Sequence, residues 1–547
     1  MFDRRVKVPL PQNEPVLEYR EGSKERKEIE AKLEELRSTE PLEIPLIIGG
    51  KEVRTGKTKD VVMPTDHGHI LARYHLAGEK EVQMAIEAAL EAHKIWSAMS
   101  YTNRLSIFLK MAELLSGPYR MEINAASMLA LGKNVHQAEI DAACELIDFL
   151  RFNAYYAQQI YDEQPLHSPK GVWNYVEYRA LEGFVLAVTP FNFTAISGNL
   201  PSSPAMMGNV ILWKPASGGP VYTGYKLMQL FREAGLPDGV INFIPGPGSQ
   251  IGEVAMDSKH LAGIHFTGST PVFQYMWKKV GENIQSYKTY PRIVGETGGK
   301  DFIVVHDSAD LDEVTVGAVR GAFEYQGQKC SAASRMYVPK KHWPTLKEKL
   351  GKMLAEVKMG DVGDFTTLVN AVIDEKAFKT ITKYIDDAKN SSDAEIVFGG
   401  TYDKSKGYFI EPTVILAKDP HYTTMEEEIF GPVLTIYVYE DDRFEEVLEL
   451  CDQTSIYGLT GAIFAKDRLA VNQAMTKLRF AAGNFYVNDK PTGSVVGQQP
   501  FGGSRASGTN DKAGSTMNLL RWVSMRAIKE NFNPPKDFQY PHMRRGT

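Results

Sequence analysis

Cysteine is scarce in this sequence, because the 547 residues include only Cys144, Cys330 and Cys451. Thiols this few and this far apart do not form the disulfide framework of a small secreted protein. Each thiol must therefore be judged singly as inert or reactive. A cysteine taken alone is more often a small buried apolar residue, and Cys144 and Cys451 keep that interpretation.

Long apolar runs and an excess of positive charge are also missing. No stretch reaches the roughly 18 consecutive apolar residues of a membrane-spanning helix. Lysine and arginine number 62 against 68 aspartates and glutamates, so the net charge of −6 supplies no basic field for nucleic acid. We therefore expect no nucleic acid and no membrane as partner, and we assign no metal site.

The N-terminal residues MFDRRVKVPLPQNEPVLEY have basic residues with no apolar run after them, which argues against a secretory signal. Hydrophobic residues make up 43% of the chain and charged residues 24%, as in ordinary globular proteins. The length predicts more than one domain, or one very large α/β unit.

Helical patterns dominate the first third of the chain, and strands alternate with helices after it. Residues 20–40 predict a charged surface helix, and residues 79–97 an amphipathic one. Short β-rich runs then alternate with segments long enough for one helix each, which indicates βαβ units and parallel sheets. We therefore predict an α/β protein with two successive units, whose first strands are residues 184–188, 209–213, 240–244 and 263–266, then 302–305.

Cys330 is the candidate nucleophile. It lies in EYQGQKCSAASR, where Gly327 and the small residues after the cysteine leave room around the thiol. The neighbouring Lys329 is expected to favour the thiolate, which is the nucleophilic form. For an isolated motif, a buried and inert cysteine is the alternative.

Glu296 is the candidate general base. It lies in RIVGETGGKDFIVV, between an apolar strand and Gly298–Gly299. A carboxylate in such surroundings has a raised pKa and suits general-base catalysis. A solvated or helix-capping carboxylate is the alternative.

A phosphate site is predicted in GIHFTGST (263–270), where small residues follow a strand. Backbone N–H groups at the start of the next helix can face a phosphate there. The usual dinucleotide fingerprint needs further glycines, which are missing, so a plain turn is the alternative. The same alternative applies to GPGSQIG (246–252).

Seven short motifs follow one another in an order that resembles the aldehyde dehydrogenase superfamily over roughly residues 45–525. The stretches AEIDAACELIDFLRFNA, FEYQGQKCSA and AAGNFYVNDKPTGSVVGQQPFGGSRASGTND are similar to its monofunctional branch that oxidises L-glutamate γ-semialdehyde to glutamate in proline catabolism. The seven motifs are TPFNF (189–193), WKPAS (213–217), FTGS (266–269), ETGGK (296–300), GQKC (327–330), EEIFGP (427–432) and PFGG (500–503).

The resemblance implies a covalent mechanism. Cys330 is the implied nucleophile, and the Asn192 side chain with the Cys330 backbone N–H is the implied oxyanion hole. Hydride transfer leaves a thioester on Cys330, and Glu296 activates the water that hydrolyses it. Keeping Glu296 favours hydrolysis over acyl transfer to coenzyme A.

The resemblance also implies NAD as cofactor, bound over the first α/β unit. Lys214 is expected at the adenosine ribose, Ser269 at the pyrophosphate, Glu428 at the nicotinamide ribose and Phe430 near the ring. NAD-selective relatives often carry an acidic residue after WKP, where this chain has Ala216–Gly218, so NADP stays open. The full implied cofactor set is Pro190, Lys214, Gly268, Ser269, Glu428 and Phe430.

The implied substrate site binds an amino acid with an aldehyde at its far end. Gly493 and Ser494 lie in a glycine-containing loop that can form an anion nest for the α-carboxylate. The resemblance adds the hydroxyl of Ser331 to that carboxylate site. It also places Phe193 and Phe501 around the aliphatic part, and Glu145 near the tunnel entrance.

The expected domains are an NAD-binding domain of residues 1–159 and 182–298, with an N-terminal helical extension, and a catalytic domain of residues 299–512. Residues 160–181 and 513–547 form the expected oligomerisation arm and C-terminal segment. Residues 173–180 alternate like an exposed strand, which needs a partner strand. We expect a homodimer, in the cytoplasm of a bacterium or the mitochondrial matrix of a eukaryote.

Two alternatives stay open beside this function. The same machinery could oxidise another amino-acid or carboxylate semialdehyde, and the Gly493–Ser494 loop and pocket length discriminate these substrates. A non-catalytic protein that keeps the fold is the other alternative, but both Cys330 and Glu296 are present.

Overall fold

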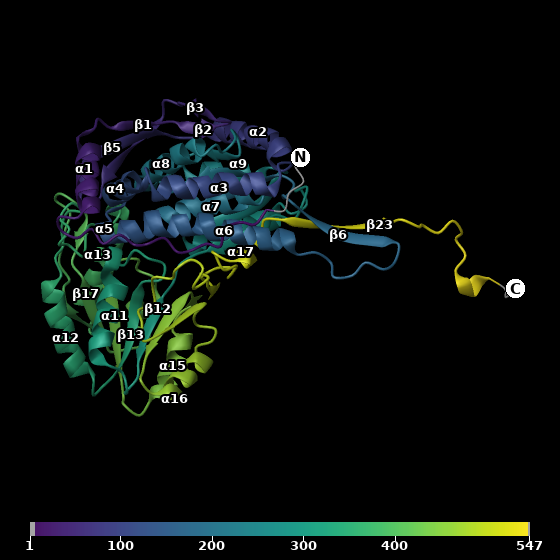
Figure 1. The fold of residues 1–547 in the computed structure, drawn as a ribbon. Coiled ribbons are helices and arrows are strands. Elements are labelled where there is room, and N and C mark those ends of the chain that lie inside the picture. Colours follow the sequence, from purple (N-terminus) through teal and green to yellow (C-terminus); the bar gives the residue numbers. More distant parts are fainter. Residues whose placement is uncertain (1–5, 545–547) are drawn as a thin grey trace.

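The computed structural model describes residues 6–544, so the first five residues of the N-terminal segment and the last three of the chain lie outside the described residues. Two seven-stranded sheets, each flanked by helices, lie one above the other in Figure 1. A two-stranded ribbon projects from the side of the molecule. The α/β class and the two successive units agree with the sequence-based prediction.

The first sheet has the strand order β11-β10-β7-β8-β9-β2-β3. Strands β11 to β9 are parallel, and β2 and β3 add an antiparallel edge. The inner strands are buried on both faces, which is why they read as continuous apolar runs. Their bounds are β2 Leu46–Ile48, β3 Lys51–Val53, β7 Phe184–Val188, β8 Val210–Lys214, β9 Ile241–Phe243, β10 Leu261–Thr267 and β11 Arg292–Glu296.

Helices cover both faces of the first sheet. In α2, Val82, Ala85, Ile86 and Ala89 are buried, as the spacing in residues 79–97 predicts. A seven-residue π-helix, Glu139–Glu145, separates α5 from α6. The helices are α1 Lys24–Ser38, α2 Glu79–Trp96, α3 Tyr101–Ser116, α4 Arg120–Leu131, α5 Val135–Ala138, α6 Leu146–Asp162, α7 Thr194–Met206, α8 Gly219–Glu233, α9 Gly248–Asp257 and α10 Thr270–Glu282.

The second sheet has the order β14-β17-β18-β13-β12-β20-β21, and only its edge strand β14 runs antiparallel to its neighbour. Its strands are β12 Asp301–Val305, β13 Ala333–Pro339, β14 Ala394–Phe398, β17 Thr413–Ala417, β18 Val433–Tyr439, β20 Thr460–Phe464 and β21 Asn484–Val487. Its helices are α11 Leu311–Phe323, α12 Trp343–Glu356, α13 Glu375–Lys389, α14 Thr423–Glu426, α15 Phe444–Gln453 and α16 Arg468–Lys477.

Smaller elements complete the fold, and the sequence analysis did not anticipate the N-terminal sheet β1-β5-β4. These elements are β1 Leu42–Ile44, β4 Thr58–Met63, β5 Asp66–His75, β15 Tyr402–Asp403, β16 Phe409–Ile410, β19 Tyr457–Gly458, β22 Ser504–Arg505 and α17 Thr516–Leu520, with 3₁₀ turns at Glu324–Gly327 and Pro541–Met543.

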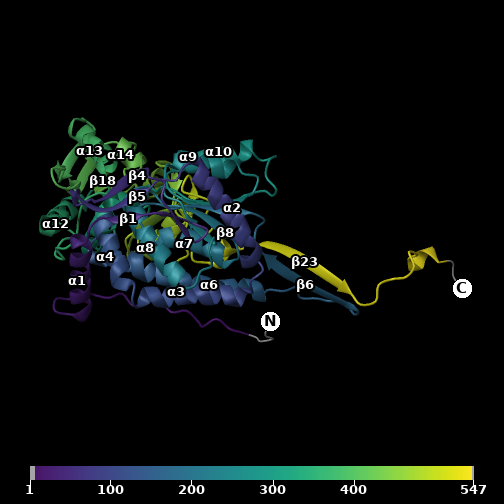
Figure 2. The same ribbon diagram turned by 90° about the horizontal axis from the view of Figure 1, so that it is seen from above.

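The projecting ribbon consists of β6 (Val172–Arg179) and β23 (Ser524–Asn531), paired antiparallel along their whole length. Figures 1 and 2 both show it extending away from the two sheets. The partner strand that residues 173–180 need is therefore supplied within the same chain. Among the described residues, no helix combines the length and apolarity needed to cross a membrane.

Candidate active site

The candidate site lies where the carboxyl edge of the first sheet meets the amino edge of the second. Strands β7 and β10 are neighbours, but the chain continues from them toward opposite edges of the sheet. Ligands of open α/β sheets bind outside the strand ends at such a switch point. Asn192 follows β7, Glu296 ends β11, and Cys330 lies just before β13.

The turn before Cys330 has an unusual backbone. Tyr325 and Gln326 both adopt left-handed conformations, with φ of 50° and 55°, and Gly327 follows with φ of 66°. Left-handed backbone costs an L-residue roughly 1–2 kcal/mol, so surrounding contacts must hold it. A Cβ on Gly327 would collide with the carbonyl of Gly431, so glycine is required there.

Side chains of the same turn supply those contacts. The Tyr325 hydroxyl donates to the Leu131 carbonyl at 3.1 Å. The Gln326 Nε2 donates to the carbonyls of Gly132 and Ala371, both at 2.9 Å, so the turn is tied to both units. The nucleophile therefore sits on a rigid backbone, as positioned catalysis requires.

The Cys330 thiol differs from the sequence-based expectation in its electrostatics. Burial raises its pKa well above the usual value, and the nearby Glu296 carboxyl raises it further. Lys329 does not offset this, because its Nζ is buried and pairs with Glu324 at 3.0 Å. The expectation that Lys329 favours the thiolate is therefore not supported, because its charge is paired with Glu324.

Asn192 is oriented by the turn that carries the nucleophile. Its Nδ2 donates to the Gln328 carbonyl at 3.1 Å, and the side chain is buried. Gln328 is itself fixed, because its Oε1 accepts the Ile373 N–H at 2.9 Å. An amide nitrogen carries two protons, so Asn192 keeps one for an oxyanion.

Glu296 is half-buried at the end of β11, and its Oε2 is buried with no hydrogen-bond partner in the described part of the chain. Burial raises its pKa to about 8, while Lys512 lowers it and Asp511 raises it. A Cβ on Gly502 would lie 2.8 Å from its Oε1, so the PFGG glycines make room for this carboxyl. This environment fits a general base that works near neutral pH.

The residues of the first sheet that the sequence analysis expects at the cofactor lie at the ends of β7, β8 and β10. Lys214 ends β8, and burial lowers its pKa to about 8. Ser269 is the N-cap of α10 and makes no capping bond with its side chain, so N–H groups of the first turn are free for an anion. Pro190 follows β7, and Gly268 donates its N–H to the Glu296 carbonyl at 3.2 Å. The four residues therefore flank the switch point.

Glu428 and Phe430 come from the second unit. The Glu428 Oε1 accepts the Gly299 N–H at 2.9 Å, and burial raises the pKa of this carboxyl to about 7. A Cβ on Gly298 would overlap the same carboxyl, so the glycine at this position of the ETGGK motif leaves room for the Glu428 side chain. Phe430 packs edge to face on Phe191, with 5.6 Å between ring centroids. This contact joins the EEIFGP motif to the TPFNF motif.

Phe193, at the start of α7, is backed by a buried ion pair that the sequence analysis missed. Lys133 Nζ lies 2.6 Å from Asp141 and 4.4 Å from the Phe193 ring centroid. Asp141 also accepts the N–H groups of Thr194 and Ala195, so it caps α7. The only sequence signal was a lysine and an aspartate eight positions apart, which is too weak to indicate a contact.

Glu145 is the last residue of the π-helix. Burial raises its pKa well above the usual value, and Asp141 raises it further, while Lys133 opposes the shift. The residue therefore faces the same charged cluster as Phe193.

The remaining substrate residues lie on two loops of the second unit. The hydroxyl groups of Ser331 and Thr492 are 2.7 Å apart, which links the nucleophile segment to the PTGSVVG loop. Gly493 has φ of 96°, and Ser494 is half-buried. Phe501 is held by two backbone hydrogen bonds with Ala513, of 3.1 and 2.8 Å. Thr492 was not singled out from the sequence.

Comparison with known proteins gives one family. Residues 52–528 match the sequence profile described as "Aldehyde dehydrogenase family". The chain is 53% identical over 541 residues to the mitochondrial delta-1-pyrroline-5-carboxylate dehydrogenase of Dictyostelium discoideum, covering 98% of this chain and 97% of that one. It is 50% identical over 532 residues to the human mitochondrial protein of the same name, covering 97% and 94%.

The fold comparison agrees with the sequence comparison. A crystal structure of the delta-pyrroline-5-carboxylate dehydrogenase from Mycobacterium tuberculosis, bound with NAD, matches with a TM-score of 0.95 and 49% identity. The match covers 99% of this chain and 100% of the other.

Proposed function

This chain belongs to the aldehyde dehydrogenase family, and from that premise we propose that it oxidises L-glutamate γ-semialdehyde to L-glutamate with NAD. The semialdehyde is the open form of delta-1-pyrroline-5-carboxylate. About half of the residues are shared, over nearly the whole length, with enzymes named for that substrate in protists, animals and bacteria. The observation that carries the proposal is the convergence of Cys330, Asn192 and Glu296 at one switch point.

The first half of the reaction joins the substrate to Cys330. The Cys330 thiol gives up its proton to solvent, and the sulfur attacks the aldehyde carbon to form a C–S bond. The free Nδ2 proton of Asn192 and the Cys330 N–H stabilise the oxyanion, and donors of this kind typically contribute about 3–4 kcal/mol each. The oxyanion collapses to a thioester on Cys330 as a hydride leaves the same carbon.

NAD supplies the acceptor for that hydride. The residues present fit it: the uncapped start of α10 suits a pyrophosphate, and Lys214 and Glu428 suit ribose hydroxyls. Phe430, two residues after Glu428, has a left-handed backbone with φ of 59°.

The second half of the reaction releases the product. Glu296, as carboxylate, accepts a proton from water, which attacks the thioester carbonyl. Asn192 again holds the oxyanion as the C–S bond breaks. The sulfur takes up the proton of the new carboxylic acid, the carboxylate leaves the Cys330 thiol, and Glu296 returns its proton to solvent.

The substrate is held at its other end by the second unit. Backbone N–H groups around Gly493 and Ser494, with the Ser331 hydroxyl, bind the α-carboxylate. Phe193 and Phe501 pack on the aliphatic part, and Glu145 lies near the entrance. The Ser331–Thr492 contact ties this loop to the nucleophile, so both ends of the substrate are placed by one segment.

NADH formation from delta-1-pyrroline-5-carboxylate and NAD tests the function directly. We expect rapid turnover with this pair, and weak turnover with acetaldehyde or with NADP. Activity with a different semialdehyde alone would keep Cys330 and Glu296 but refute the carboxylate site. An absence of NADH formation with every aldehyde would refute the proposed function.

The proposal also covers the domains, the oligomeric state and the compartment of the protein. An NAD-binding domain of residues 1–159 and 182–298, a catalytic domain of residues 299–512, and an arm with C-terminal segment of residues 160–181 and 513–547 fit the two sheets and the ribbon. The ribbon has two free edges and fits a homodimer. The compartment is the mitochondrial matrix for a eukaryotic source and the cytoplasm for a bacterial one.

A further inference from the structure

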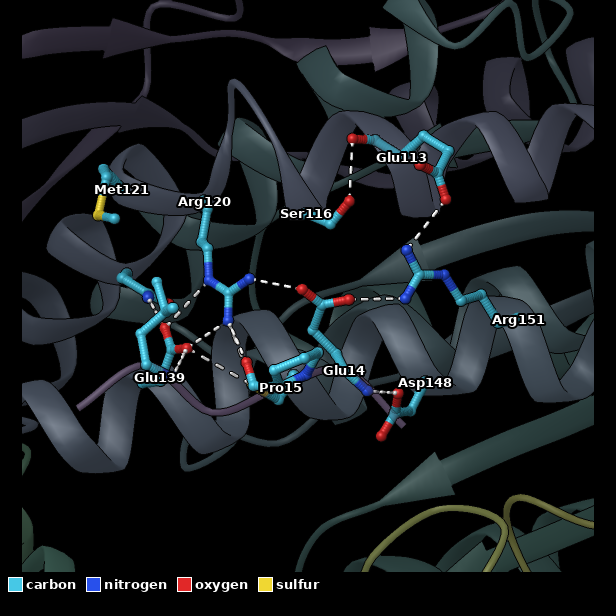
Figure 3. A network of polar contacts seen from close by, with 12 residues as sticks. Glu14, Pro15, Glu113, Ser116, Arg120, Met121, Glu139, Asp148 and Arg151 are labelled. Carbon is cyan, nitrogen blue, oxygen red and sulfur yellow. Dashed lines mark hydrogen bonds and ion pairs between the residues drawn. The ribbon is translucent and has the colours of Figure 1, made fainter. Parts of the chain in front are cut away.

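Residues 6–20, here called the N-terminal strap, lie outside both sheets and run along α6 and the π-helix without secondary structure of their own. None of the seven motifs falls in this segment. Even so, charged side chains anchor it to the helices. Glu14 forms ion pairs with Arg120 and Arg151, each at 2.6 Å, and Figure 3 shows its carboxylate between the two guanidinium groups.

Backbone contacts fix the strap on both sides of Glu14. The Glu14 N–H donates to Asp148 at 2.8 Å, and the Leu17 N–H donates to Glu139 at 2.8 Å. The Tyr19 hydroxyl donates to the same buried Glu139 at 2.7 Å. A chain segment held by buried, charge-assisted bonds is rigid enough to position something else.

The loop of residues 493–499, here called the anchor loop, carries the two residues assigned to the α-carboxylate, Gly493 and Ser494. Two hydrogen bonds join this loop to one strap side chain, Asn13. The Asn13 Nδ2 donates to the Val496 carbonyl at 2.7 Å, and the Gln498 Nε2 donates to the Asn13 Oδ1 at 3.0 Å.

Asn13 is itself held in place. The second Nδ2 proton goes to Asp148 on α6 at 2.8 Å, so each polar atom of this amide has a partner. The loop keeps its own turn through the Gln498 and Gln499 N–H groups, which both donate to the Val495 carbonyl at 3.0 Å. Hydrogen bonds within the loop therefore maintain its turn, and Asn13 ties the loop to the strap and to α6.

Packing leaves the loop little room. Gly497 has φ of 83°, and a Cβ there would collide with the Phe152 ring on α6. The loop thus lies directly on α6, where Asn13 meets it.

We propose that Asn13 is a positioning residue for substrate binding, holding the anchor loop so that its N–H groups converge on the α-carboxylate. This inference rests on the proposed function, since it takes Gly493 and Ser494 as the carboxylate site. A displaced loop would weaken recognition of the carboxylate while leaving Cys330, Asn192 and Glu296 in place.

The test compares Asn13→Ala with Gln498→Ala, and uses Gln12→Ala, an exposed neighbour on the strap, as the matched control. For glutamate γ-semialdehyde we expect Asn13→Ala to raise KM about tenfold, the size of one lost hydrogen bond of good geometry, with kcat nearly unchanged. Gln498→Ala should raise KM by about threefold. The KM for NAD and for propionaldehyde, which has no α-carboxylate, should stay at the wild-type value, as should all constants of Gln12→Ala.

Unchanged KM for the semialdehyde in Asn13→Ala would overturn the inference, as would an equal loss with both aldehydes, which would indicate a merely structural role. If Asn13→Ala does not fold, Gln498→Ala carries the same comparison from the loop side. A wild-type protein that oxidises propionaldehyde but not the semialdehyde would refute the proposed function instead, so the two failures are distinct.

Discussion

The proposed nucleophile Cys330 and base Glu296 are each partly buried, and the loss of solvent contact raises the pKa of both groups. Each also raises the cost of charging the other, because two negative charges in one site repel. Both shifts favour the protonated forms of the thiol and the carboxyl.

The pH dependence of turnover follows from Glu296. A general base acts in its deprotonated form, and burial raises the pKa of this carboxyl to about 8. We therefore expect kcat, where thioester hydrolysis limits it, to rise with pH through about 8. A glutamate with the ordinary pKa of about 4.3 would give a flat profile there.

The matched variant is Glu296→Gln, which removes the base and keeps the shape. A rapid-mixing experiment should still show a burst of NADH, followed by a steady-state rate slower by about 100-fold or more. A pH profile that keeps its rise in Glu296→Gln would assign the titration to another group.

Thiol reactivity distinguishes Cys330 from the other two cysteines. Cys144 and Cys451 are buried, at 6% and 0% exposure, and burial raises the pKa of Cys451 to about 12. Cys330 is more exposed. Iodoacetamide followed by peptide mapping should label Cys330 first, with NAD and substrate protecting it. Equal rates at all three positions would contradict a reactive nucleophile.

At the scale of elements, the sequence predicts regular structure well and the supports of the site poorly. The run at 184–188 is a strand with the same bounds, and the run at 302–305 is a strand that begins one residue earlier, because buried parallel strands are continuous apolar runs. Nothing local indicated left-handed backbone at Tyr325 and Gln326, since neither is glycine. Their partners, the carbonyls of Leu131, Gly132 and Ala371, are distant in the sequence.

Most of the site residues could be identified only from the order of the seven motifs in the sequence. From local signals, Cys330 and Glu296 were candidates and Lys329 was given the wrong role, because its ion pair with Glu324 depends on how the turn folds. Asn192 and Glu428 have no local signature of function. Their proximity is a property of the two sheets together.

The start of α7 gives a prediction at this scale. Asp141 caps that helix and pairs with Lys133, and both side chains are 1% exposed. Asp141→Asn leaves a buried lysine without its counter-charge, which typically costs about 3–5 kcal/mol. Urea denaturation should show this loss. Asp387→Asn, at an exposed position on α13, is the control and should be neutral. A neutral Asp141→Asn would mean that Lys133 is buried as the free amine.

At the scale of the whole molecule, the reaction is divided between two sheets. The first carries Asn192, Glu296 and the proposed cofactor residues Pro190, Lys214, Gly268 and Ser269. The second carries Cys330, the proposed cofactor residues Glu428 and Phe430, and the proposed carboxylate loop. The switch-point rule predicts where the first half of the site lies. No local pattern predicts how the second unit docks against it.

The ribbon gives a prediction for the assembly. Trp173 and Met525 are 53% and 60% exposed on it, which suits a surface that a second copy covers. The double variant Trp173→Glu with Met525→Glu should shift a dimer toward monomer in light-scattering measurements. Leu469→Glu, 77% exposed on α16, should not. A wild-type monomer would refute the arm's assigned role.

The contact between Asn13 and Val496 also has a consequence for how the protein is made. The two residues are 483 positions apart, so the strap leaves the ribosome long before the loop that it holds. Contacts of such separation form late, because the intervening chain must first be ordered. The strap can dock on its own helices early, and the loop then folds onto a surface already in place. The anchor loop can therefore take its place only after most of the chain has been synthesised.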